Sequence, residues 1–133
     1  NLELYYTEDP GVPPWVKGDA PRIRQSLINL LTNAIKFTAQ GSVRLGLHWR
    51  RATRSTIALS FTVEDTGIGI IPEFHGRIFE QFMHAPQRLA RDPHRGLGIG
   101  LYLVRELTRL HGGDVTVASR PGYGSIFTVS LPT

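Results

Sequence analysis

The sequence predicts an α/β (α+β) two-layer sandwich, in which helices cover one face of a mixed, mostly antiparallel sheet. The chain has 133 residues, of which 41% are hydrophobic and 20% charged. This composition suits one globular domain over residues 1–133, with a substantial core. The predicted strands come in hairpins rather than one per helix, and that order argues against a doubly wound parallel sheet.

The first half of the chain predicts an edge strand, a helix and a hairpin. Residues 2–6 alternate weakly, as an edge strand does. Asp19 is a good N-cap, Pro21 suits a first helical turn, and apolar residues recur at helical spacing over 23–37. Residues 43–49 and 57–63 alternate around a polar turn, which is typical of a hairpin.

The second half predicts a short helix, a loop, a longer helix and a second hairpin. Helical spacing returns over 97–110 and ends at two glycines, which favours a helix with a glycine cap. The remaining predictions are a short helix over 72–82, a polar loop over 83–95, and strands over 115–118 and 125–131.

Composition and charge exclude several classes of function. The chain has no cysteine, so disulfide scaffolds, thiolate zinc sites and cysteine nucleophiles are excluded. Its net charge of +4 is mild and scattered, and we expect no nucleic-acid partner. No apolar stretch is long enough for a membrane helix, and we expect no direct membrane contact. We interpret the chain as a piece of a longer protein.

The first predicted helix carries two amides and an ammonium group on one face. Asn29, Asn33 and Lys36 are spaced i, i+4 and i+7, and we expect this face to meet solvent. The opposite stripe, expected to be buried, is Leu27, Leu30, Leu31 and Ile35. Asparagine oxygens suit Mg²⁺, and a lysine one turn away suits phosphate. A plain solvated helix face explains the same pattern equally well.

Three glycine clusters offer close approach to backbone amides. They are Asp65-Thr-Gly67-Ile-Gly69, Gly96-x-Gly98-x-Gly100 and Gly122-x-Gly124. The second comes where a helix begins, which favours phosphate binding, although it matches neither the Rossmann nor the Walker A pattern. Asp65 stands at a strand end beside aliphatic residues and suits the exocyclic amine of adenine. A turn-forming Asp is the alternative, and a simple turn explains the third cluster.

Five motifs that occur in a fixed order connect these features with one protein family. Residues 29–38, 65–69, 78–82, 96–101 and 122–127 read NLLTNAIKFT, DTGIG, IFEQF, GLGIGL and GYGSIF. In this order they closely resemble the N, G1, F, G2 and G3 boxes of the catalytic ATP-binding domain of two-component sensor histidine kinases. The resemblance extends over residues 19–132.

The resemblance implies a Bergerat fold that binds ATP and Mg²⁺ under a mobile ATP lid at residues 83–95. It implies Asn29 and Asn33 as metal ligands, and Lys36 and Arg95 as catalytic contacts to phosphate. The full nucleotide-binding set that it implies is Asn29, Asn33, Lys36, Phe37, Asp65, Gly67, Gly69, Gly96, Gly98, Gly100, Leu101 and Ser125.

The resemblance also implies transfer of the γ-phosphate to a histidine, for relay to a response regulator or receiver domain. ATPase relatives of this fold carry a water-activating glutamate where this chain has Asn29, which is no base. None of the five histidines matches a phosphoacceptor box, so we expect the acceptor on dimerisation helices elsewhere in the same protein. The resemblance implies a cytoplasmic domain and permits an inner-membrane anchor in the parent. Alternatives are a nucleotide-binding switch without transferase activity and a serine kinase of the anti-sigma type.

Overall fold

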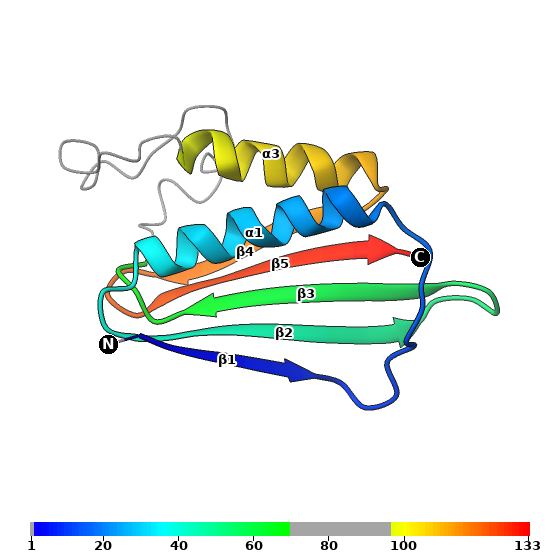
Figure 1. The fold of residues 1–133 in the computed structure, drawn as a ribbon, viewed down its shortest axis with the longest axis horizontal. Helices are drawn as coiled ribbons and strands as arrows, with labels where there is room; N and C mark the ends of the chain where they lie inside the picture. The colour runs from blue at the N-terminus through cyan, green and yellow to red at the C-terminus, as the bar shows by residue number, and fades with distance from the viewer. Residues whose placement is uncertain (1, 70–96) are drawn as a thin grey trace.

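The computed structural model describes residues 2–69 and 97–133, with side chains for all of these except 97–100. In these ranges two helices cover one face of a five-stranded sheet (Figure 1). The elements are β1 (Leu2–Glu8), α1 (Ala20–Lys36), β2 (Gly41–Arg51), β3 (Ile57–Asp65), α3 (Leu97–Leu110), β4 (Asp114–Arg120) and β5 (Gly124–Pro132). The predicted short helix over 72–82 and lid over 83–95 lie outside the described residues.

The sheet is mixed, as predicted, with strand order β1-β2-β3-β5-β4. The β2–β3, β3–β5 and β4–β5 pairs are antiparallel, whereas β1 pairs with β2 in parallel. That parallel pair follows from the chain path, because α1 carries the chain back along the sheet before β2 starts. The predicted two-layer α/β class is confirmed.

Helix α1 begins as predicted, but the face that it buries is only partly the predicted one. The Asp19 side chain accepts a hydrogen bond from the Arg22 backbone N–H at 3.2 Å, which confirms the N-cap. The buried residues of the helix are Ser26, Leu30, Asn33 and Ala34. The solvent-facing position expected for Asn33 is therefore wrong, since that side chain is 7% exposed. The expected burial of Ile35 is also wrong, because this residue is 43% exposed.

Helix α3 occupies the predicted range and ends in a Schellman motif. Gly112 has a φ of 84°, its N–H bonds Arg109 O at 3.0 Å, and the Gly113 N–H bonds Thr108 O at 3.0 Å. A Cβ on Gly113 would lie 1.8 Å from Ser130 O, so only glycine lets the chain pass so close to β5. The cap therefore fixes the path of the chain from the end of α3 into β4.

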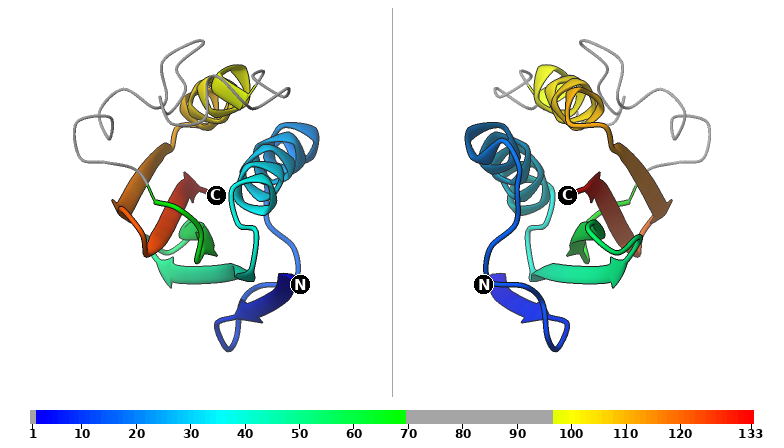
Figure 2. Two further views of the ribbon diagram at one scale, coloured as in Figure 1. Left: turned by 90° about the vertical axis from the view of Figure 1, so that its left-hand side faces the viewer. Right: turned by 90° about the vertical axis from the view of Figure 1, so that its right-hand side faces the viewer.

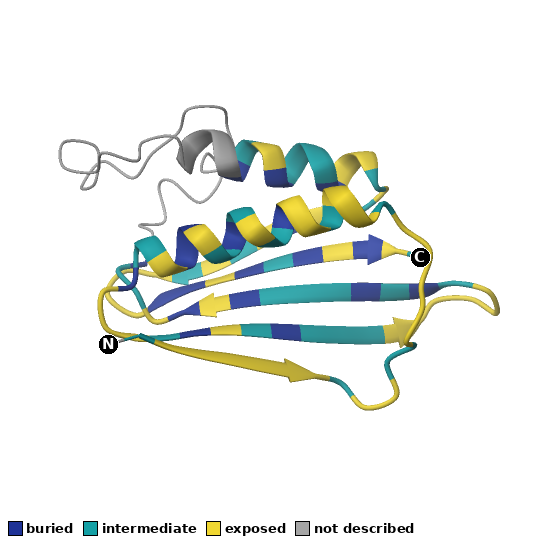
Figure 3. Ribbon diagram, in the orientation of Figure 1, coloured by how far each residue is buried: buried dark blue, intermediate teal, exposed yellow. Residues whose placement is uncertain are grey.

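The core lies between the helices and the sheet face that they cover (Figure 3). Leu30, Val63, Val104 and Phe127 are among its most deeply buried side chains. Alternate residues of β3 and β5 face this core, and burial of their apolar surface stabilises the two layers together. Neither of the described helices is both long and apolar enough to cross a membrane.

Candidate functional site

Buried polar side chains gather at one end of the core. Here α1 ends, β3 ends, and β5 and α3 begin (Figure 1). The buried polar residues on these segments are Asn33, Thr38, Asp65 and Ser125. Asp65 and Ser125 are register partners on β3 and β5, where they continue the stripes that elsewhere carry core residues. Polar groups thus replace apolar ones at this end of the core.

Asp65 is held by backbone donors. Its Oδ1 accepts a hydrogen bond from the Gly67 N–H at 2.9 Å, so the turn-forming role left open by the sequence is present. Burial raises the pKa of the Asp65 carboxyl, and the backbone N–H groups of Gly67 and Ser125 offset part of the rise. The Thr38 hydroxyl also offsets it, although the two side chains do not meet the geometry of a full hydrogen bond.

The two glycines after Asp65 are required by close backbone packing. A Cβ on Gly67 would lie 2.4 Å from Phe37 O and 2.8 Å from Thr38 Oγ1. Gly69 has a φ of 76°, and a Cβ there would lie 2.1 Å from Arg120 O. The loop after β3 is therefore pressed between the chain that follows α1 and the β4–β5 turn. This packing sets the position of the Asp65 carboxylate.

Asn33 and Asn29 differ in what their side-chain oxygens do. Asn33 Oδ1 is buried and has no hydrogen-bond partner among the described residues. A buried acceptor without a donor is costly, and a neutral amide oxygen is a suitable ligand for Mg²⁺. The residue at Asn33 therefore fits the metal that the resemblance implies. Asn29 Oδ1 already accepts a hydrogen bond from Gln25 Nε2 at 3.0 Å, a contact that the sequence analysis did not single out.

Most of the other predicted site residues lie in the described part of the chain, and two do not. Lys36 lies in the last turn of α1, with Phe37 as the C-cap residue. Gly98 and Gly100 lie in the first turn of α3, whereas Arg95 and Gly96 lie outside the described residues. Leu101 packs in the hydrophobic core. The Ser125 hydroxyl lies 2.8 Å from Ser119 Oγ on β4.

Thr38 was missed as a site residue, although it stands inside the first motif directly after Phe37. Its hydroxyl lies against the position of Gly67, so it borders the Asp65 carboxylate. The signal that marks it is therefore the motif itself and not any helical pattern, because α1 has ended by then.

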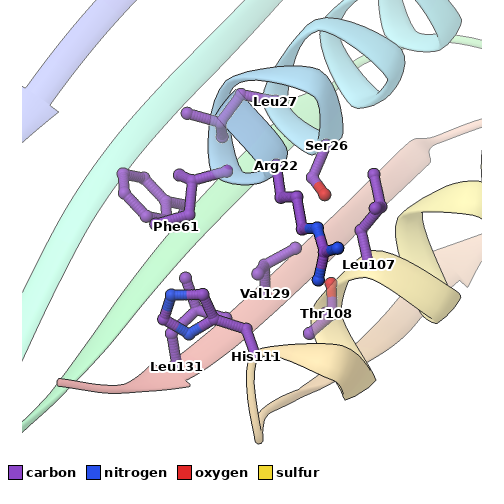
Figure 4. A pocket seen from close by; sticks show the side chains of 10 residues that line it. Arg22, Ser26, Leu27, Phe61, Leu107, Thr108, His111, Val129 and Leu131 are labelled. Atoms are coloured by element: carbon purple, nitrogen blue, oxygen red, sulfur yellow. The ribbon is translucent and has the colours of Figure 1, made fainter. Parts of the chain in front are cut away.

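A cavity between the N-terminal half of α1 and the C-terminal half of α3 lies away from this cluster (Figure 4). Ser26, Thr108 and His111 are among its lining residues, and its free volume is about 10 Å³. That space is too small for a nucleotide. His111 Nε2 accepts a hydrogen bond from the Asp19 N–H at 3.1 Å, so this histidine joins the end of α3 to the start of α1.

Comparison with known proteins identifies the family. The family model described as "Histidine kinase-, DNA gyrase B-, and HSP90-like ATPase" matches residues 18–133. The chain belongs to this family. Hybrid signal transduction histidine kinase B of Dictyostelium discoideum is 41% identical over 98% of the chain. Circadian input-output histidine kinase CikA of Synechococcus elongatus is 43% identical over 87% of the chain.

The structural neighbours within the family agree. The full-length structure of ShkA in complex with AMPPNP has a TM-score of 0.79 and 32% identity over 98% of this chain. The nucleotide-free catalytic domain of histidine kinase ThkA has a TM-score of 0.73 and 26% identity. These findings confirm the resemblance to histidine kinase catalytic domains. The chain spans 7% of the Dictyostelium protein, 15% of CikA and 25% of ShkA.

Proposed function

We propose that this chain is the ATP-binding catalytic domain of a protein-histidine kinase. It binds ATP at the buried polar end of the core and presents the γ-phosphate to a histidine on the dimerisation helices of the same protein. One observation carries this proposal: the Asn33 amide oxygen, which has no hydrogen-bond partner among residues 2–69 and 101–133, and the buried Asp65 carboxylate occur at the same end of the two layers.

Each side chain of this cluster has a chemical role that suits its surroundings. Asn33 Oδ1 is a suitable Mg²⁺ ligand, and Asn29, one helical turn earlier, is the second proposed ligand. Bound Mg²⁺ neutralises phosphate charge. The Lys36 ammonium group contacts phosphate as a point charge. Asp65 accepts a hydrogen bond from the exocyclic amine of adenine. Guanine carries a carbonyl oxygen at that position and cannot donate this hydrogen bond.

Phosphoryl transfer from such a site needs mainly alignment and charge neutralisation. Asn29 stands where the ATPase relatives carry a general base, and an amide does not deprotonate water at neutral pH. The site therefore favours transfer to an acceptor brought from another segment over hydrolysis. In the same proposal, Arg95 contacts the transferring phosphate, and Gly96, Gly98 and Gly100 border the triphosphate.

The proposed acceptor and relay partners follow from the family. We place the phosphoacceptor histidine on dimerisation helices of the same protein and the next step on a response regulator or receiver domain. One of the relatives is a hybrid kinase by name.

The chemical stability of the transferred phosphate tests this function. The full-length protein that contains this chain is incubated with γ-labelled ATP and Mg²⁺, and the labelled protein is then treated with acid or base. A phosphohistidine loses its label in acid and keeps it in base. Acid-stable label would indicate a serine kinase, and absence of label from a protein that binds ATP would indicate a switch module. Either result overturns the proposal.

A further inference from the structure

The side of α1 that faces away from α3 is apolar and exposed. Ile28 is 48% exposed and Ile35 is 43% exposed, and they lie seven residues apart on one face of the helix. Ordinary surface helices carry polar side chains on their outer face. These two aliphatic residues are therefore available to a partner.

The sheet continues this exposed surface beyond α1. Leu4 and Tyr6 of β1 pair with Val43 and Leu45 of β2, so they stand on the side of the sheet that the helices cover. Figure 2 shows that β1 extends past α1. Leu4 is 64% exposed and Tyr6 is 56% exposed as a result. The helix layer leaves this edge of the sheet bare.

A groove runs into the core beside this surface. Its volume is about 400 Å³, and its apolar lining comes from Val16, Ile23, Leu27, Ile28, Leu59 and Phe61. Trp15 is 89% exposed on the segment that precedes α1, next to the lining residue Val16. An apolar groove with exposed aromatic and aliphatic neighbours is typical of an interaction site.

The charged residue among those that line the groove is Arg24, and an acidic residue lies nearby on β1, where exposed Glu8 accepts a hydrogen bond from the Tyr6 hydroxyl at 2.8 Å. Helix α1 carries Arg22, Arg24 and Lys36 and has no acidic residue. Arg22 is paired with Asp19 at 3.2 Å, whereas Arg24, which lines the groove, and Lys17 have no ion-pair partner within residues 2–69 and 101–133. A partner with carboxylates beside its apolar side chains would complement these two cations.

We propose that this surface, formed by the groove and the exposed apolar side chains of α1 and β1, docks an amphipathic helix with acidic flanks. A helix is favoured because its side chains at i, i+3 and i+4 fill a concave groove. A membrane presents a plane to a protein and does not fill a groove. A second copy of this chain offers Glu8 on this surface against the two cations Arg24 and Lys17, and so complements them less well than a helix with acidic flanks does. The surface lies on the opposite side of α1 from Asn33, so the proposal is independent of the nucleotide site.

Two synthetic peptides of about five helical turns provide the probe. Both carry the same leucine stripe, flanked by glutamate in one and by lysine in the other. Binding to this chain is followed by tryptophan fluorescence, to which Trp15 and Trp49 both contribute, and by amide chemical shifts. We expect the glutamate peptide to bind at least about tenfold tighter than the lysine peptide, because only it meets Arg24 and Lys17 with opposite charge.

Matched variants locate the binding. Arg24→Glu is expected to reduce the preference for the glutamate peptide to about threefold or less, and Ile28→Asp to weaken both peptides. Arg109→Glu, an exposed change on α3, is the control and keeps the wild-type preference. Nucleotide affinity, measured on the same variants, is expected to stay at the wild-type value, so failure here is distinguishable from failure of the proposed function.

Several results would overturn the docking proposal. They are equal affinity for the two peptides, shifts that lie away from the groove, and a preference unaltered by Arg24→Glu. Binding to anionic lipid vesicles that Ile28→Asp abolishes would assign the surface to a membrane. A concentration-dependent dimer lost in the same variant would assign it to a second copy of the chain.

Discussion

The two sides of helix α1 reverse the usual distribution of polar and apolar residues. Its inner side buries Asn33 Oδ1, which has no hydrogen-bond partner in the part of the chain that the structure describes, and its outer side exposes Ile28 and Ile35. Burying an unpaired polar group and exposing aliphatic surface both cost stability. Both features have a cost to folding, and we propose that a ligand on the inner side and a protein partner on the outer side account for them.

The largest expected effect is on the backbone packing that supports the inner side. Gly69→Ala places a Cβ 2.1 Å from Arg120 O at a φ of 76°, and we expect the free energy of unfolding to fall by at least about 3 kcal/mol. Gly122→Ala is the matched control, because its φ is 83° and a Cβ there meets no atom within 4 Å. Its expected loss is about 1 kcal/mol. Equal losses in chemical denaturation would contradict the packing argument.

The next effect separates the two sides of α1 directly. Asn33→Ala is expected to weaken binding of a Mg²⁺–ATP analogue by at least about tenfold, which is about 1.4 kcal/mol, because it removes the proposed ligand. The loss of folding stability is expected to stay below about 1 kcal/mol, since Oδ1 forms no hydrogen bond within the described residues. Ile35→Ser on the outer side is the control. If calorimetry finds that Asn33→Ala binds the Mg²⁺–ATP analogue with wild-type affinity, the proposed role of the inner side of α1 is contradicted.

The sequence predicted the elements that depend on local signals, but not the full orientation of α1. The Asp19 N-cap, the helix over 97–110 and both hairpins were predicted because capping residues, periodicity and turn glycines are local signals. The orientation of α1 was partly wrong. Which side of a helix is buried depends on where its neighbours lie, and here Asn33 is buried whereas Ile35 is exposed.

The site was predictable as a set of residues but not as a set of contacts. The motifs identified Asn33 and Asp65, whose polar character is unusual beside aliphatic runs. The approach of Gly67 to Phe37 O joins segments thirty residues apart, and no local pattern encodes it. The Gln25–Asn29 hydrogen bond depends on side-chain rotamers that spacing alone does not fix.

The smallest expected effect is the pH dependence of Asp65. Burial raises its pKa, so the folded state favours the protonated carboxyl, and its ionisation lowers stability as pH rises from about 3.8 through the raised value. An adenine amine favours the ionised form, so nucleotide affinity is expected to rise over that window. Asp65→Asn removes both trends. Affinity that is independent of pH in the wild type, after correction with this variant, would contradict the role of Asp65.

The central claim is that the polar end of the core holds the nucleotide. A crystal structure with Mg²⁺ and a non-hydrolysable ATP analogue tests it most directly. The account predicts Mg²⁺ about 2.1 Å from Asn33 Oδ1 and the adenine amine within hydrogen-bonding distance of the Asp65 carboxylate. A purine or a metal ion bound elsewhere, with both side chains left as they are here, would contradict it.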